Sequence, residues 1–539
     1  MMTLMNVRYV FTLVSLLVFT ACSGSPSMGD PDGGQADAQS PDARSPDACS
    51  PSSEEVCGDF LDNTCDGEVD EGCPDPGSHI WANDLGGPLG EDLVTAVVST
   101  ADGHAIVLLA HDGEATFGRG QSNETTLPAF HGHQRLMSAA RYGASGELIW
   151  ARRIIASNAI QQSVGSRSLI YTPDNGLLVA GSFRGVATIG PDSESPISFG
   201  QANTTSAFLA KFDADGNVVW ANEMEGGNTH SMALLPNGKI ALAGSSLAGV
   251  VFDSNGPNQQ VLLPRADFRD LGYVAWFEPS GSFLHAAAIT DYLEYPLHVV
   301  AGPNNSTELF GAGMVTIDDG TTSITTETAG LYRCVFTSDA SIERLDLLVE
   351  VANSFQVGEV ALGENGDIFI TGDMRGSALL APGMASEVSL DLDTAGTYIL
   401  HYTSDLQLDW HRVYGGVASG SGYAIVSDPL VPGGAIVAGQ LGGVVTIGSG
   451  EANEVTLGEP SRRKLYVARF DENGNVRWVR SAKTLGSYNR ATTLALLPDH
   501  SIVTAGQIGS NTVFGEGQDN VSTLEVQHTA QGFIAVLSL

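Results

Sequence analysis

The residues best suited to bind a ligand lie in a short cysteine-rich segment near the N-terminus. Carboxylates spaced around a glycine occur there as Asp62-x-x-x-Asp66-Gly-x-x-Asp70. Such spacing lets a loop wrap one hard cation, as calcium-binding loops do. In that register the ligands are Asp62, Thr64, Asp66, the backbone carbonyl of Glu68, and Asp70. Calcium is the expected ion because every ligand atom is an oxygen, although Cys73 stands where such loops usually end on a glutamate.

The same segment, residues 49–75, carries four cysteines spaced eight residues apart, at Cys49, Cys57, Cys65 and Cys73. In an exported chain, closely spaced cysteines in a segment with almost no core predict two disulfides. Three pairings are possible, and the spacing does not choose among them. A metal-free disulfide knot and a thiolate site for zinc or copper remain alternatives to the calcium loop.

The first 21 residues predict an export signal. Arg8 precedes an apolar core at 10–19, which is too short to span a membrane as a helix. Thr20 and Ala21 come directly before Cys22, which resembles the cleavage box of bacterial lipoproteins despite Phe19 in place of the usual leucine. The resemblance implies a lipid on Cys22 and an anchor at the outer membrane or cell surface. A plain secretory signal with an incidental cysteine is the alternative.

Residues 22–48 are rich in Ser, Pro, Asp, Ala and Gly, with SPDA occurring twice. This composition predicts a disordered tether, because it offers almost nothing to bury.

A repeated motif fills residues 79–539. One half is an apolar strand that usually ends in Ala-Gly, and seven copies lie at 105–118, 177–190, 240–252, 308–317, 368–376, 435–448 and 502–509. The other half is a hairpin, as in AFLAKFDADGNVVWANE at 207–223 and LYVARFDENGNVRWVRS at 465–481. The last copy stops after one hairpin strand, and its missing partner stands at the other end of the domain, at 79–87.

These patterns predict an all-β chain: a seven-bladed β-propeller of four-stranded blades. An N-terminal strand at 79–85 would close the ring beside 532–538, and the disulfide-rich segment would precede it.

The repeats LLVAGSFRGVATIG and AFLAKFDADGNVVW resemble seven-bladed propeller repeats of secreted proteins from environmental Gram-negative bacteria. The third and fourth repeats depart from the pattern, with Phe283 and Leu345 in place of tryptophan and Cys334 within a strand. EVCGDFLDNTCDGEVDEGC at 55–73 resembles a metal-binding motif that often lies between lipoprotein signals and such propellers. The resemblance implies a surface-anchored propeller with a metal-binding module.

Other candidate residues have simpler explanations. Asp213, Asp215, Asp471 and Asn473 lie in hairpin turns, where their side chains favour the turn itself. The His131-x-His133 pair lacks an identified third ligand, and Cys334 is expected to be a buried thiol. The chain has no GxSxG, HExxH or phosphate-binding glycine motif.

The charge of the chain limits its partners. Asp and Glu number 62 against 25 Lys and Arg, a net charge of −37 that disfavours nucleic acid and anionic membrane surfaces. The acidity concentrates divalent cations, or it simply keeps an exported protein soluble.

We expect a binding scaffold for a protein or glycan ligand, with an extracellular glycan-active hydrolase or lyase as the alternative. The segments between second and third strands vary in sequence and predict the binding face, unless their variation is drift. They lie at 119–136, 191–206, 253–271, 317–329, 377–395 and 449–464.

Overall fold

The computed structural model describes residues 55–539, except for 60, 62, 65–69, 71, 130–134, 162–168, 202, 255, 265–270, 352–353, 416–417, 461, 485, 487 and 528. The predicted signal peptide, Cys22, the tether and Cys49 lie outside the described residues. So do Cys65, His131, His133 and three of the predicted calcium ligands: Asp62, Asp66 and Glu68.

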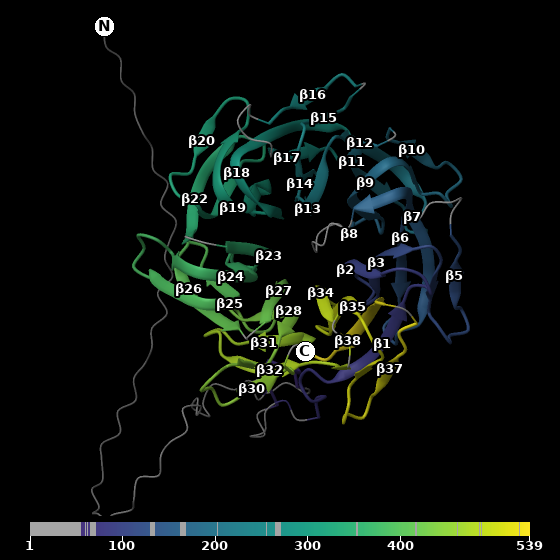
Figure 1. Cartoon of the computed structure of the whole chain (residues 1–539), viewed down its shortest axis with the longest axis vertical. Coiled ribbons are helices and arrows are strands. Elements are labelled where there is room, and N and C mark those ends of the chain that lie inside the picture. Colours follow the sequence, from purple (N-terminus) through teal and green to yellow (C-terminus); the bar gives the residue numbers. More distant parts are fainter. Residues whose placement is uncertain are drawn as a thin grey trace, which may run out of the picture. The chain divides into compact units, whose positions relative to one another are not determined.

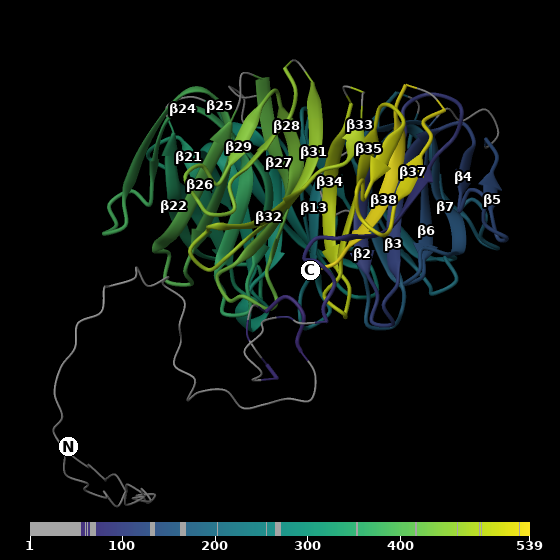
Figure 2. The same ribbon diagram turned by 90° about the horizontal axis from the view of Figure 1, so that it is seen from below.

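The described residues form an all-β fold, which runs from β1 (His79–Leu85) to β38 (Gln531–Leu537) with one 3₁₀ helix at Pro303–Asn305. The sheets stand around a central axis, and the chain passes around that axis from β1 to β38 (Figure 1). Seen from the edge, the strands run between two faces of the ring (Figure 2). This radial arrangement of antiparallel sheets is that of a β-propeller. The all-β repeat fold predicted from the sequence is confirmed.

The first repeat shows the unit from which the ring is built. Its innermost strand β2 (Leu93–Ser99) pairs with the second strand β3 (Ala105–Asp112), which pairs with the third, β6 (Arg135–Tyr142). The outermost strand is β7 (Leu148–Gln161), which pairs with β6. The strand with Ala-Gly character is thus the second of four, as the sequence predicted.

The same antiparallel order, from innermost to outermost strand, recurs in the next three repeats: β8 (Leu169–Tyr171), β9 (Leu177–Ile189), β11 (Thr205–Phe212) and β12 (Val218–Glu225); β13 (Asn228–Leu234), β14 (Ile240–Ser246), β17 (Leu271–Phe277) and β18 (Phe283–Ala301); and the end of β18 with β19 (Thr307–Asp318), β21 (Gly330–Phe336) and β22 (Ile342–Val351). The following two repeats consist of β23 (Ser354–Leu362), β24 (Ile368–Leu380), β25 (Val388–Tyr402) and β26 (Leu408–Gly415), and of β27 (Ala418–Ser427), β28 (Ala435–Gly442), β31 (Arg463–Phe470) and β32 (Val476–Arg480). The last repeat consists of β34 (Arg490–Leu496), β35 (Ile502–Ile508), β38 and β1.

The Ala-Gly pair has a steric cause. A Cβ added at Gly244 would lie 2.0 Å from the carbonyl oxygen of Asn228 on the innermost strand and 2.5 Å from the ring of Tyr273 on the third strand. At Gly439 the added atom would lie 2.1 Å from the Ser421 carbonyl oxygen. Glycine therefore lets the innermost strand and a buried aromatic ring approach the second strand from both sides.

The segments between the second and third strands, expected to be variable in sequence, contain regular short hairpins. In four repeats the hairpin has two short strands of its own: β4 (Ala115–Phe117) with β5 (Thr125–Leu127), β15 (Val250–Phe252) with β16 (Gln260–Leu262), β29 (Val445–Ile447) with β30 (Val455–Leu457), and β36 (Thr512–Phe514) with β37 (Ser522–Leu524). In the other repeats the end of a long second strand forms one side of the hairpin: the end of β9 pairs with β10 (Ile197–Phe199), the end of β19 with β20 (Ser323–Thr325), and the end of β24 with the start of β25. The registers are nearly constant, as in Thr116↔Thr126, Thr188↔Ser198, Val251↔Val261, Leu379↔Ser389, Thr446↔Thr456 and Val513↔Thr523.

These hairpins join neighbouring repeats. The outermost strand of one repeat hydrogen-bonds to the hairpin of the next, as in Ile155↔Ile189, Glu225↔Val251, Ile289↔Ile317 and Glu350↔Leu379. A two-residue strand, β33 (Lys483–Thr484), makes the corresponding contact with β36. The hairpins therefore link neighbouring sheets through strand pairing. This explains why the register of the hairpins is kept while their sequence varies.

The two ends of the repeat region meet in one sheet. β1 pairs antiparallel with β38, in a register that includes Trp81↔Val536 and Leu85↔Gly532. Trp81 is 8% exposed and Leu85 is fully buried, and both join an apolar cluster with Val94 and Val503. The predicted pairing of 79–85 beside 532–538 is confirmed.

Candidate functional site

An exposed apolar patch on the third repeat is the strongest candidate for an interaction site. Leu247, Val261 and Leu263 are 72%, 52% and 66% exposed, and they lie on or beside the β15–β16 hairpin. A neighbouring groove of about 490 Å³ is lined by Leu247 together with Glu223 and Glu225 of β12. Isolated exposed apolar side chains are common, but a cluster beside a groove marks a surface suited to another molecule.

The end of the central channel forms a second cavity, of about 510 Å³. Each innermost strand contributes to its wall, through residues that include Val98, Tyr171, Leu234, Ala301, Glu359, Ile425 and Ala495. Glu359 is the one acid among the residues that line this cavity, and its Oε2 accepts a hydrogen bond from the Ile425 amide at 3.2 Å.

The cysteine-rich segment contains a disulfide between Cys57 and Cys73. Of the predicted calcium ligands, Thr64 and Asp70 are described. Asp70 Oδ1 accepts a hydrogen bond from the Gly58 amide at 2.8 Å, and the Thr64 amide donates to Glu55 Oε1 at 2.7 Å. Glu55, which precedes the disulfide-enclosed segment, also accepts a hydrogen bond from the Asp70 amide at 3.2 Å, and the sequence prediction had missed this residue.

The acidic turn residues are structural, as predicted. Asp213 Oδ1 accepts a hydrogen bond from the Asp215 amide at 3.0 Å, and Asp471 Oδ1 accepts one from the Asn473 amide at 2.9 Å. These contacts fold the hairpin turns and leave no need for a ligand.

Cys334 lies in β21 and is a fully buried free thiol. Burial, with a smaller contribution from the carboxylates of Asp346 and Asp319, raises the pKa of this thiol to about 12. The expectation of a buried thiol is confirmed.

The chain closes through a hairpin turn made from its two ends. The Ser538 amide donates to the Ser78 carbonyl at 2.9 Å, which matches the bond from the Asp471 amide to the Asn475 carbonyl in the continuous turn of the preceding repeat. The hydroxyl of Ser538 also donates to the Asp75 carbonyl at 2.9 Å. Residues 75–78 and 538 thus reproduce a turn that no peptide bond connects.

A tryptophan and an arginine from the preceding repeat hold this split turn. A Cβ at Gly77 would lie 2.9 Å from the Trp478 ring, so the glycine rests directly on the indole. Arg480 donates from Nη2 to the Pro76 carbonyl at 2.5 Å and from Nε to the Gly77 carbonyl at 3.2 Å. The signal that could have found this contact is the shared spacing Gly77-x-x-x-Trp81 and Gly474-x-x-x-Trp478.

His79 begins β1 and lies at the same seam, 2% exposed. Its Nε2 lies 2.8 Å from Ser522 Oγ, and its ring stacks on Phe514 with centroids 5.8 Å apart. Burial lowers the pKa of this imidazole to about 4, so the ring is neutral at neutral pH.

A search of the described residues for three or more clustered His, Cys, Asp or Glu side chains that could hold a metal finds none. Within the same residues, no helix has both the length and the apolar character needed to cross a membrane.

The chain matches no known protein-family profile. It is 29% identical over 140 residues to an uncharacterized WD repeat-containing protein of Acanthamoeba polyphaga mimivirus, a match covering 25% of this chain and 10% of that protein. The chain thus spans about a tenth of the length of this curated relative.

Two solved structures overlap most of the chain. The Dos1 propeller is 8% identical with a TM-score of 0.36, over 85% of this chain and 94% of that one. Sqt1 from Chaetomium thermophilum is 12% identical with a TM-score of 0.27, over 86% and 99%.

Proposed function

We propose that this protein is a surface-anchored lipoprotein whose β-propeller is a scaffold for binding another protein. The observation that carries the interaction role is the exposed apolar patch of Leu247, Val261 and Leu263 beside the 490 Å³ groove. The patch contains aliphatic side chains and no aromatic ring, which favours a protein surface over a sugar ring. The strand pairing between neighbouring repeats provides the rigid framework that such a surface needs.

Arrays of proteins and glycans probed with residues 23–539 test the binding role. We expect protein ligands, and we expect Leu247→Ser with Leu263→Ser to weaken binding at least tenfold. Leu89→Ser is the matched control, since Leu89 is 57% exposed and lies outside the patch. Binding that is unchanged by the patch variant, or reduced equally by the control, would contradict this site.

We also propose that the ring has seven blades. Seven antiparallel sets of four strands support this count, with β18 shared between two sets. The channel cavity supports it independently, because β2, β8, β13, β18, β23, β27 and β34 each contribute to its wall. A crystal structure with six or eight blades would refute the proposal.

The membrane anchor is a lipid on Cys22 in this proposal, and the support is the small-residue box before Cys22 with the polar tether after it. We expect Cys22→Ser to move the protein from the membrane fraction to the soluble exported fraction. Equal incorporation of radiolabelled palmitate into the variant would show that the lipid is elsewhere.

The cysteine-rich segment is proposed to bind calcium. The Cys57–Cys73 disulfide encloses all five predicted ligand positions in the sequence, and the Asp70 carboxylate accepts a hydrogen bond within that loop while Glu55, just before it, accepts one from the Thr64 amide. Asp62, Asp66 and Asp70 with the Thr64 hydroxyl and the Glu68 carbonyl would supply the all-oxygen ligand set.

Calorimetry on the oxidised exported chain tests the calcium proposal. We expect weak binding, with Kd on the order of 10⁻⁴ to 10⁻³ M as in extracellular modules, and its loss in Asp66→Ala. Absence of heat at millimolar calcium, or equal heat from the variant, would leave a disulfide knot alone.

With Cys57 bonded to Cys73, we propose that the second predicted disulfide joins Cys49 to Cys65. Peptide mapping of the non-reduced protein checks this pairing, and a Cys49–Cys57 or Cys65–Cys73 bond would contradict it.

A further inference from the structure

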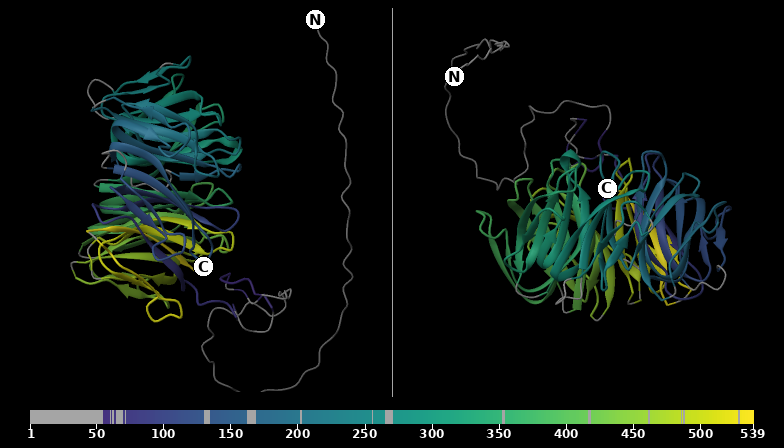
Figure 3. Two further views of the ribbon diagram at one scale, coloured as in Figure 1. Left: turned by 90° about the vertical axis from the view of Figure 1, so that its right-hand side faces the viewer. Right: turned by 90° about the horizontal axis from the view of Figure 1, so that it is seen from above.

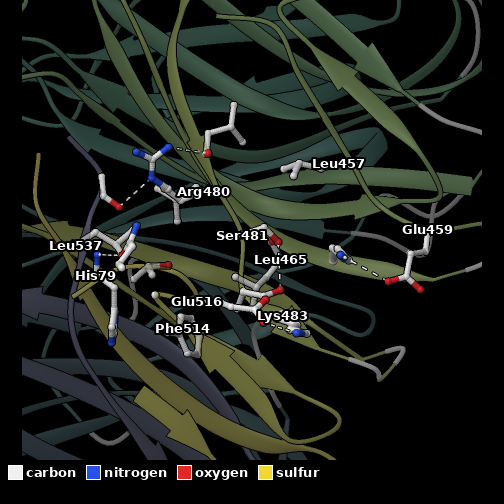
Figure 4. A pocket seen from close by; sticks show the side chains of 18 residues that line it. His79, Leu457, Glu459, Leu465, Arg480, Ser481, Lys483, Phe514, Glu516 and Leu537 are labelled. Carbon is white, nitrogen blue, oxygen red and sulfur yellow. Dashed lines mark hydrogen bonds and ion pairs between the residues drawn. The ribbon is translucent and has the colours of Figure 1, made fainter. Parts of the chain in front are cut away.

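A cavity of about 510 Å³ opens at the seam where the two ends of the chain meet (Figure 4). It lies between the sheet formed by β27, β28, β31 and β32 and the sheet formed by β34, β35, β38 and β1. β32 ends at Arg480, and two residues interrupt the edge before the two-residue strand β33. Ser481 Oγ donates to the Leu465 carbonyl at 2.7 Å, which satisfies backbone at this break. By contrast, the outermost strand of the first repeat, β7, runs for 14 residues.

The floor of this seam cavity is apolar. Side chains from both sheets and from the β36–β37 hairpin form it: Leu465, Val467, Val479, Phe514 and Leu537. A cavity of this volume is within the range that small ligands occupy, and such a floor favours an apolar ligand body.

The rim of the cavity is basic in an acidic chain. The protein has a net charge of −37 and four lysines, and two of these, Lys464 and Lys483, line the cavity with Arg480. Segment 462–490 contains eight Lys and Arg against two acids. Arg469 of this segment forms a buried ion pair with Asp428 and Arg480 holds the split turn, whereas Lys464 and Lys483 add positive charge at the cavity rim.

Each rim cation is available to an incoming anion. Lys483 pairs with Glu516, but their side chains are 61% and 54% exposed, and water screens such surface pairs so that they add little stability. Lys464 Nζ lies 3.7 Å from Glu459 Oε1, and Glu459 is also paired with Arg462 at 3.3 Å.

Arg480 is positioned without an acid. It donates to three backbone carbonyls, those of Pro76, Gly77 and Val479. Among the residues that the structure describes, no carboxylate lies within ion-pair distance of Arg480. Besides these carbonyls, the Asp75 carboxylate acts on the Arg480 charge from beyond ion-pair distance.

We propose that the seam cavity binds a small amphipathic carboxylate, with its apolar body on the floor and its carboxylate against the rim lysines and Arg480. A monoanion fits better than a phosphate dianion, because Glu459 and Glu516 would repel a second charge. This site lies apart from the apolar patch of the third repeat, so the proposal goes beyond the proposed interaction role. Its test does not depend on whether the patch binds a protein.

Calorimetry with residues 23–539 tests the proposal, with 4-phenylbutyrate as the probe. We expect 4-phenylbutan-1-ol and 4-phenylbutylamine, which share its apolar body, to bind at least tenfold more weakly. Lys464→Gln with Lys483→Gln should weaken phenylbutyrate binding about tenfold, or about 1.4 kcal/mol. Lys211→Gln with Lys239→Gln removes the same charge elsewhere and should change binding less than twofold.

Lysine labelling provides a second readout in the unmutated protein. Because the chain has four lysines, an amine-reactive reagent followed by mass spectrometry reports on each. Phenylbutyrate should slow labelling of Lys464 and Lys483 and leave Lys211 and Lys239 unchanged. Absence of binding, equal binding of the alcohol, equal loss in both lysine variants, or protection of all four lysines would each overturn the proposal.

Discussion

Two hairpin turns in adjacent repeats have the same form, although a peptide bond connects only one of them. In the continuous turn, Gly474 has φ +73° and lies against Trp410, and Arg412 donates to the Asn473 carbonyl at 3.0 Å. In the split turn, Gly77 has φ +72° and lies against Trp478, and Arg480 makes the equivalent contact with the Pro76 carbonyl (in Figure 3 the C-terminus lies near the purple start of the described chain). The geometry is therefore set by contacts with the preceding repeat and not by chain connectivity.

The two turns differ in what happens when a contact is lost. In the continuous turn the chain keeps the third and fourth strands together, so a lost contact is only a local defect. In the split turn the same contacts must also hold the first strand of the chain on the last sheet. We therefore expect equivalent changes to have larger effects at the split turn, because they also release chain entropy.

The largest effect should come from removing the closing strand. Deleting residues 79–87 exposes the edge of β38 and removes the buried Trp81 and Leu85, whose side chains alone contribute roughly 3–6 kcal/mol. Deleting residues 23–48 should leave stability unchanged. Urea unfolding of the two deletion proteins measures the difference, and equal stability would mean that β1 does not close the ring.

A methyl group at the turn glycine should have the next largest effect. Gly77→Ala places a Cβ 2.9 Å from the Trp478 ring and forces a positive φ on alanine, so we expect a loss of about 2–3 kcal/mol. Gly474→Ala should lose less, even though its Cβ would be 2.6 Å from Trp410.

Gly103→Ala separates backbone strain from the clash, because Gly103 has φ +79° and nothing within 4 Å of the added atom. We expect about 1 kcal/mol there. Thermal unfolding of the three variants gives the order, and a smaller loss at Gly77 than at Gly103 would contradict the contact with Trp478.

The two arginines provide a smaller and more selective test. Arg480→Gln removes donors to two carbonyls across the break, and charged donors typically contribute about 1.5–3 kcal/mol. Arg412→Gln removes the matching contact in the continuous turn and should lose about half as much. Equal losses in denaturant unfolding would show that connectivity makes no difference.

The smallest effect concerns pH. The pKa of His79 is lowered to about 4 by burial, so the unfolded chain binds more protons than the folded chain between pH 4 and 6.5. Stability from this group is complete above pH 6.5 and falls as the pH drops towards 4. His79→Gln should reduce this pH dependence of the unfolding free energy, whereas a steeper dependence in the variant would contradict the assignment.

Much of the fold could be predicted because its determinants are local. The Ala-Gly strands and Gly-containing turns repeat in the sequence, and the incomplete last hairpin identified β1 as the partner of β38. The hairpins that link neighbouring repeats were missed because strands of three residues, such as Ala115–Phe117, are too short to show the alternation of apolar and polar residues that marks a strand. Their signal is a fixed spacing between the two paired residues of each hairpin, as between Thr446 and Thr456, which is shared by most repeats.

The candidate sites were harder to predict, because they depend on distances between repeats. Leu247 and Leu263 look like ordinary strand residues until their exposure is known. Lys464 and Lys483 gather at one cavity because β32 ends early, which no local pattern indicates. In the cysteine-rich segment the sequence predicted the chemistry, but Glu55 lay outside the expected ligand spacing.

Hydrogen exchange tests most directly whether β1 completes the last sheet. In the intact chain at neutral pH, peptides covering His79–Leu85 should exchange as slowly as those covering Val476–Arg480, the outermost strand of the preceding sheet. Gly77→Ala should speed exchange in β1 more than in β32. Exchange of β1 at the rate of an unfolded peptide, with β32 still protected, would show that the N-terminal strand does not close the ring.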